Sequence, residues 1–167
     1  WLLKEFARYI SYQEGQYGGV TKGTLKKYRA IYNHLEAFVE LEYGQEDLEL
    51  RKIKKSFIVR FWEYLRGTAR IGQNTSAKYI RHVKKVFRSY VEKGFIDAHP
   101  FPNYTQRVVE EKKEFLTLPE LERIEALDIS IDRLELIRDA FLFSCYTGLA
   151  YTDLKNLTVD HLYDGTV

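Results

Sequence analysis

The spacing of apolar residues predicts a mostly α-helical protein. In four segments before residue 94, apolar residues recur at intervals of three and four, which is the period of a helix with one buried face. These segments begin near Leu2, Thr21, Ser56 and Asn74. Aromatic residues fill much of the predicted core, because the chain contains ten Phe, thirteen Tyr and two Trp.

Turn residues mark the predicted boundaries of these helices. Thr21 is expected to cap the second helix, and Gly44 to end it. Asn74 or Thr75 is expected to cap the fourth helix. The weakly alternating segment 48–53 is expected to be an extended connection.

The chain after the fourth helix begins with a predicted linker. The range 96–104 contains two prolines, which favour an extended conformation. Thr117 with Glu120 forms a capping-box pattern before a predicted helix that ends at Leu127.

The last predicted helices lie on either side of a glycine turn. A helix from Ile131 to Cys145 is expected to stop at Gly148, and Thr152 to cap a shorter helix. The apolar residues of this helix are expected to form one buried face. That face consists of Ile137, Ala140, Phe141, Ser144 and Cys145.

Charge is distributed very unevenly along the chain. The range 1–107 has 20 Lys/Arg and 11 Asp/Glu, a balance of +9, whereas 108–167 has a balance of −7. The range 51–93 has 13 basic and two acidic residues. This division favours a basic module with a polyanionic partner, followed by a different unit.

The basic residues of the fourth predicted helix fall on one stripe. Lys78, Arg81, Lys85 and Arg88 are spaced three, four and three apart, and no acidic residue relieves their repulsion before Glu92. A face that is merely solvated usually mixes charges of both signs. The stripe therefore favours contact with DNA, with a solvated face as the alternative.

Other functional classes find little support in the residues. The four histidines have no Cys or carboxylate partners at metal-ligand spacing, and no phosphate-binding or nucleophile-elbow motif is present. The single Cys145 fits a reducing, cytoplasmic setting. No segment is long and apolar enough to suggest a membrane partner. Because the chain opens on Trp1 and contains no methionine, we expect it to be a piece of a longer protein.

Several motifs together resemble the tyrosine recombinase, or phage integrase, family. The strongest are FLTLPELERIEAL, which begins at Phe115, and RDAFLFSCYTGLAYTDLKNLT, which begins at Arg138. GTLKKY from Gly23 and NTSAKYIRHVKKVFRSYVEKG from Asn74 support them. The chain is most similar to integrases of mobile elements in Bacteroides-like bacteria.

The resemblance implies two domains. Residues 1–103 would form a four-helix SAM-like core-binding domain, 104–113 a linker, and 114–167 the helical start of a mixed α/β catalytic domain. In the family, the helical module clamps one side of double-stranded DNA, with the second and fourth helices facing the major groove. The implied DNA-binding residues are Thr24, Lys27, Asn74, Thr75, Lys78, Arg81, Lys85 and Arg88.

The family joins DNA through a 3′-phosphotyrosyl intermediate, with no metal or nucleotide cofactor. None of the tyrosines here has the context of the nucleophile, so the resemblance implies catalysis by residues beyond Val167, in a parent protein that multimerises on DNA. The family's first catalytic arginine follows the TGL motif, and that position is Ala150, while Asp153 matches the supporting acidic position.

Three explanations of Ala150 remain open. The chain belongs to a subgroup in which another residue replaces the arginine, or to a relative that has lost activity, or Arg138 or Lys155 takes over the role. Two other functions also remain open. They are a DNA-binding regulator that uses the same module, and a helical module that binds an acidic protein.

Overall fold

The computed structural model describes residues 1–17, 19–110, 112–158 and 161, and divides the chain into two compact units. Unit 1 comprises Trp1–Glu110 and unit 2 comprises Glu111–Val167. Helices and connections make up all of the described ranges, which contain no strand. The prediction of a mostly α-helical chain is therefore confirmed.

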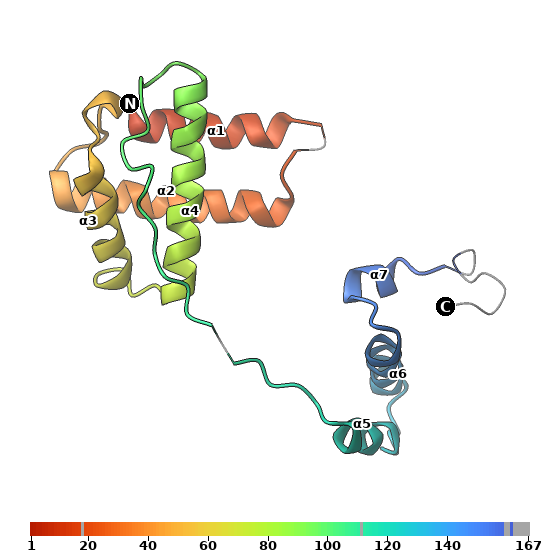
Figure 1. Cartoon of the computed structure of the whole chain (residues 1–167). Coiled ribbons are helices and arrows are strands. Elements are labelled where there is room, and N and C mark those ends of the chain that lie inside the picture. Colours follow the sequence, from red (N-terminus) through yellow and green to blue (C-terminus); the bar gives the residue numbers. More distant parts are fainter. Residues whose placement is uncertain (18, 111, 159–160, 162–167) are drawn as a thin grey trace. The chain divides into compact units, whose positions relative to one another are not determined.

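Unit 1 contains the four predicted helices. They are α1 (Leu2–Gly15), α2 (Lys22–Tyr43), α3 (Lys55–Arg66) and α4 (Gln73–Glu92). Helices α1 and α2 lie side by side, and α4 crosses them (Figure 1).

The predicted boundaries of α2 are confirmed by the geometry of its caps. The Thr21 hydroxyl accepts a hydrogen bond from the Thr24 amide at 3.3 Å. Gly44 ends the helix with φ of 60°, and its amide donates to the Glu40 carbonyl. This left-handed conformation disfavours residues that carry a Cβ atom.

Three boundary predictions were wrong. The range 48–53 is not simply extended, because it contains a short 3₁₀ helix, η1 (Leu50–Lys52). Helix α3 begins one residue before Ser56. Gly72, rather than Asn74 or Thr75, is the N-cap of α4, and its carbonyl accepts the Ser76 amide.

The core of unit 1 is built around aromatic side chains. Phe38 of α2 contacts the rings of Phe57, Phe61 and Tyr64 of α3 at centroid distances of 5.3–5.5 Å. Helix α4 adds Phe87, which is fully buried. Aromatic pairs at such distances stabilise a fold by about 1 kcal/mol each beyond the burial of their area.

Residues 96–110 form a return segment that runs back beside α4 (Figure 1). The prediction that 96–104 is only a linker was wrong, because Ile96 and Phe101 are buried in the core. The Lys84 ammonium of α4 donates hydrogen bonds to the carbonyls of Pro102 and Tyr104, both at 2.7 Å. The return segment is thus part of unit 1.

His99 binds the return segment to α4 through both ring nitrogens. The Phe101 amide donates to Nδ1 at 3.2 Å, so Nδ1 is the acceptor and Nε2 carries the proton. Nε2 then donates to the Lys84 carbonyl at 3.1 Å. Protonation of Nδ1 would break the first of these bonds, and burial lowers the pKa of His99 in any case.

The described part of unit 2 contains three helices. They are α5 (Leu118–Glu125), α6 (Asp132–Thr147) and α7 (Tyr151–Lys155). The Glu120 carboxylate reaches back to the Thr117 amide at 2.8 Å, as the capping pattern predicts. Gly148 ends α6 with φ of 73°, which confirms the predicted turn.

Two predictions about unit 2 were wrong. Ile137 and Phe141 are 56% and 43% exposed, so the predicted face of α6 is not a core, and Leu142 is the buried residue of this helix. The described part of unit 2 supplies only three helices, which are too few to cover an apolar helix on several sides. Ala150, rather than Thr152, is the N-cap of α7.

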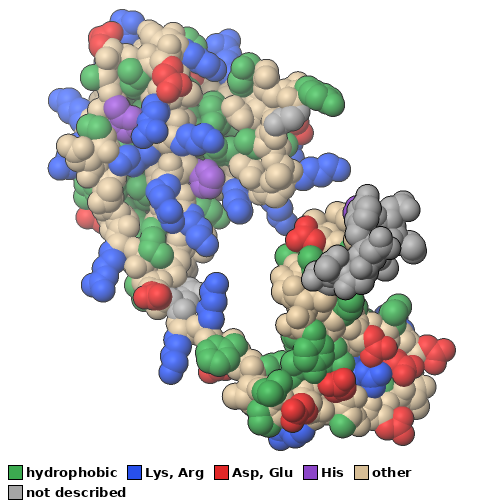
Figure 2. All heavy atoms as spheres, turned by 45° about the vertical axis from the view of Figure 1, so that its right-hand side comes forward, with side chains coloured by type: hydrophobic (Ala, Val, Ile, Leu, Met, Phe, Trp, Pro, Cys, Tyr) green, Lys and Arg blue, Asp and Glu red, His purple; other side chains and the backbone are tan. Residues whose placement is uncertain are grey.

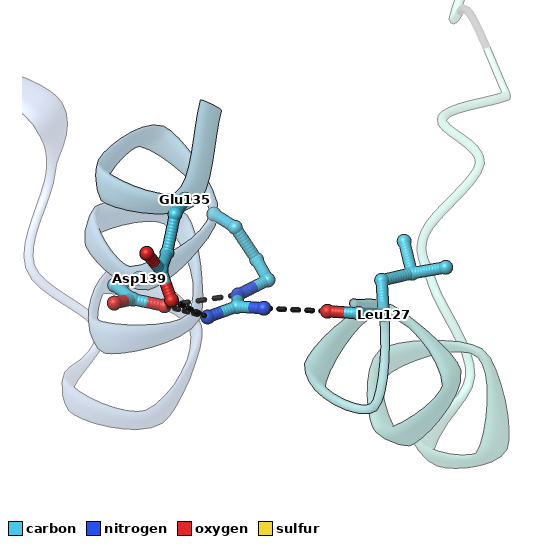
Figure 3. Close-up of polar contacts among 4 residues, drawn as sticks. Leu127, Glu135 and Asp139 are labelled. Atoms are coloured by element: carbon cyan, nitrogen blue, oxygen red, sulfur yellow. Dashed lines mark hydrogen bonds and ion pairs between the residues drawn. The ribbon is translucent and has the colours of Figure 1, made fainter. Parts of the chain in front are cut away.

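Polar contacts join α5 to α6. The Arg138 guanidinium donates to the Leu127 carbonyl at 2.6 Å and pairs with Asp139 at 2.8 Å and with Glu135 at 3.4 Å (Figure 3). Tyr146 adds a hydrogen bond to Glu125 at 2.8 Å. These contacts fix Arg138 between the end of α5 and the first half of α6.

We predict that Lys84→Ala lowers the free energy of unfolding of the chain by about 1–2 kcal/mol, since it removes charged hydrogen bonds to two carbonyls. Lys85→Ala is the matched control, because Lys85 is exposed and makes no ion pair within the described residues. Urea unfolding measures the free energy of unfolding of both variants. Equal stabilities of the two variants would contradict the assigned role of Lys84.

Candidate nucleic-acid interface

Helix α4 has a buried face and an exposed basic face. Its buried residues are Ser76, Ala77, Ile80, Val83, Val86, Phe87 and Tyr90. The predicted residues Lys78, Arg81, Lys85 and Arg88 are all exposed. None of these four cations forms an ion pair with any residue that the structure describes.

Helix α2 contributes Lys27 to the same basic region. Lys27 is exposed, and its charge acts on His82 of α4 together with the charges of Lys85 and Arg81. Burial first, and then these three cations, lower the pKa of His82. The structure therefore brings the predicted cation of α2 together with two predicted cations of α4. We call these three cations and His82 the basic cluster.

The remaining predicted polar residues have different surroundings. Thr75 is exposed at the start of α4. Thr24 is half-buried, and its hydroxyl lies 3.1 Å from that of Thr21, so it forms part of the N-terminal cap of α2. Asn74 is half-buried as well.

The Asn74 side chain holds the return segment. Its amide nitrogen donates to the Val109 carbonyl at 2.9 Å, and its oxygen accepts the Val109 amide at 2.8 Å. Gln73 adds a bond to the Arg107 carbonyl at 3.0 Å. The start of α4 therefore fixes the backbone of the return segment at two points.

Lysine and arginine side chains gather densely on the surface of unit 1, with histidine among them (Figure 2). In unit 2, acidic and apolar side chains are prominent on the same view. A dense field of one sign attracts polyanions and raises the rate at which they associate.

A family model described as the phage integrase SAM-like domain matches residues 2–108, which is almost all of unit 1. The chain belongs to this family. Comparison with curated proteins and with solved structures gave no match. The SAM-like domain thus includes the return segment, whose residues up to 108 fall inside the matched range.

The position implied for the first catalytic arginine lies at the start of α7. The Ala150 carbonyl accepts the amides of Asp153 and Leu154, both at 2.9 Å. Asp153 is exposed and has no ion-pair partner within the described ranges. Arg138 is held by Glu135, Asp139 and the end of α5, so substitution for the missing arginine would require it to leave these contacts.

The described residues offer neither a metal site nor a membrane-spanning helix. No group of three or more His, Cys, Asp or Glu side chains in the described ranges is placed to hold a metal ion. No helix in those ranges combines the length and the apolar character needed to cross a membrane.

Sequence reasoning missed the residues that act through tertiary contacts. The spacing of residues along α4 does not predict the role of Lys84. Lys84 and Lys85 are adjacent in sequence, and only the folded structure shows that Lys84 contacts the return segment while Lys85 is exposed. The environment of His82 depends on Lys27, which lies 55 positions earlier in the sequence. The two prolines of 96–104 gave no sign of the buried Phe101 between them.

We predict that Asn74→Ala speeds hydrogen exchange at the Val109 amide by about tenfold or more, because it removes the acceptor of that amide. Thr75→Ala is the control, since Thr75 is exposed. Exchange measured by mass spectrometry or NMR would distinguish them. Unchanged protection at Val109 in the Asn74 variant would show that other contacts hold the return segment.

Proposed function

We propose that unit 1 binds double-stranded DNA through the exposed face of α4 and the neighbouring part of α2, as the DNA-binding part of a site-specific recombinase. The observation that carries this proposal is a face of cations that form no ion pair with the described residues, on a helix whose other side is buried. The family membership supports it, since integrases act on DNA.

The chemistry of this face suits a phosphate backbone. Lysine and arginine neutralise phosphates and release counterions, whereas polar side chains at the start of a helix reach base edges or sugars. Thr75 is exposed beside Lys78 and remains a predicted contact. For Asn74 we propose a role in holding the return segment, which leaves any contact to DNA as a secondary one.

We propose further that the complete recombinase cuts and rejoins DNA through a tyrosine outside the present residues and works as a multimer on DNA in the cytoplasm. Ala150 and Asp153 would lie at the start of its catalytic site. The assignment to mobile elements of Bacteroides-like bacteria stays a prediction from the sequence motifs.

The DNA-binding proposal predicts a large effect when the stripe on α4 is removed. Replacement of Lys78, Arg81, Lys85 and Arg88 by Ala should abolish detectable binding to a short random duplex, and circular dichroism should show an unchanged helix content. The matched control replaces four other exposed cations of unit 1. These are Arg51, Lys52, Lys54 and Lys55.

Salt dependence gives the second readout of this experiment. The slope of log K against log salt should be about −0.9 for each phosphate contact. The control variant should retain most of the wild-type slope. Absence of binding by the wild-type chain at low salt would overturn the proposal and favour a module that binds an acidic protein.

A DNA-binding regulator without recombinase activity is the second candidate function. The observation that favours it is Ala150, which offers neither a charge nor a hydrogen-bond donor to a phosphate. Both candidates predict the same binding by unit 1. They differ only in whether the complete protein cleaves DNA.

We predict that Ala150→Arg leaves helix content unchanged, because Ala150 is exposed and caps α7 with its carbonyl. In the complete protein we expect no gain in strand cleavage, as in a subgroup whose site uses another residue. A gain of about 100-fold, the size of effect that one lost anion-stabilising donor has, would instead indicate lost activity.

A further inference from the structure

His82 occupies an unusual place at the junction of α4 and α2. Its half-buried ring packs edge-on against Tyr28, with ring centroids 5.1 Å apart and an interplanar angle of 76°. Tyr28 in turn packs against Tyr9 of α1 at 5.4 Å. This stack of rings holds His82 within the basic cluster, with Lys27 on α2 and with Arg81 and Lys85 on α4.

The groups around His82 make its protonation unfavourable in the free protein. From α2 it is faced by Lys27 and Tyr28, from α4 by Arg81 and Lys85, and through Tyr28 by Tyr9 of α1. Burial and the three cations all lower its pKa, and none of the described carboxylates opposes them. Burial and these cations therefore favour the neutral form of His82 in the free protein.

The other two histidines of unit 1, His34 and His99, differ from His82 in their charged neighbours or in their hydrogen bonds. Burial alone lowers the pKa of His34, whose ring packs against Tyr64 and Tyr79. His99 uses both ring nitrogens to hold the return segment. His82 makes no hydrogen bond with any residue that the structure describes, so its ring is available to a ligand.

An anion bound in the basic cluster would favour the protonated form of His82, whereas the cations alone favour the neutral form. Three cations that form no ion pair with any described residue attract a phosphate, and a phosphate near the ring favours the charged form of imidazole. Imidazolium then donates a charge-assisted hydrogen bond, which is about twice as strong as a neutral one. The same cations that keep His82 neutral in the free protein draw in the group that protonates it.

We propose that His82 is an additional DNA-backbone-binding residue, which takes up a proton as a phosphate docks among Lys27, Arg81 and Lys85. This inference rests on the proposed DNA-binding function. It adds His82 to the proposed DNA-binding residues of α4. It also predicts that the protein takes up a proton when it binds DNA.

Linkage fixes the direction of the pH effect. If the complex binds one more proton than the free protein, affinity for DNA rises as the pH falls through the pKa of His82 in the complex. It levels off below the pKa of His82 in the free protein, which burial and the nearby cations lower. Acid has the opposite effect on the fold, because a histidine whose pKa is lowered by folding stabilises the protein only while it is neutral.

The test measures the affinity of the full chain for a short random duplex between about pH 5.5 and about pH 8 by fluorescence anisotropy. We expect wild type to bind several-fold more tightly at the acidic end, with about tenfold as the limit for a tenfold change in the proton affinity of one group. His82→Gln should bind with little dependence on pH. His34→Gln, the matched control, should keep the wild-type dependence.

A second measurement needs no variant. NMR titration of the His82 ring protons should give a higher pKa in the DNA complex than in the free chain, whereas the pKa of His34 should not change. Circular dichroism at the acidic end should show that the chain is still folded. Because this titration uses the wild-type chain, it tests the inference even if His82→Gln fails to fold.

The outcomes separate this inference from the DNA-binding proposal. Salt-dependent binding without a pH effect, a pH effect that survives in His82→Gln, or an unchanged pKa of His82 in the complex would each overturn the inference while the DNA-binding proposal stands. Absence of salt-dependent binding at every pH would overturn both.

Discussion

Burial of one face of α4 is the constraint on which the arrangement of unit 1 depends. Each large apolar side chain that this helix buries contributes about 1.5–3 kcal/mol. Repulsion between like charges one turn apart costs only about 0.2–0.5 kcal/mol per pair. Packing therefore fixes the rotation of α4, and the repulsion among Lys78, Arg81, Lys85 and Arg88 remains as a smaller cost on the exposed side.

That fixed rotation gives α4 three different surroundings around its circumference. One side enters the aromatic core, one side holds the return segment through Gln73, Asn74 and Lys84, and one side carries the exposed cations. Lys84 and Lys85 are neighbours in sequence, yet one is tied to two carbonyls and the other belongs to the basic cluster. The contacts that hold the return segment and the proposed DNA contacts thus lie on different faces of the same helix.

Unit 2 differs from unit 1 in how much apolar surface it buries. Its described residues bury few apolar side chains, and polar contacts of Arg138 and Tyr146 join α6 to α5. Exposed apolar side chains such as Phe115 and Tyr151, at 86% and 77%, remain on its surface. At the position implied for the catalytic arginine, unit 2 has the exposed Ala150, and Asp153 has no ion-pair partner within the described residues.

The sequence alone predicted the features that depend on residues close together in the chain. Helical periodicity identified the four helices of unit 1 and their exposed cations, because it requires only residues three and four positions apart. Thr21, Gly44 and Gly148 were correctly placed at helix ends for the same reason. Charge counts separated the basic part of the chain from the acidic part, since they depend on no contact at all.

Tertiary structure decided what depends on residues distant in sequence. Asparagine is a residue type that often caps helices, but the Asn74 side chain binds the backbone of Val109, which lies 35 positions away. Lys84 is distinguished from Lys85 only by carbonyls 18 and 20 positions away. The cations that surround His82 come from two helices. No local pattern encodes these pairings, because they arise only when the buried faces of the helices pack together and fix which side chains meet.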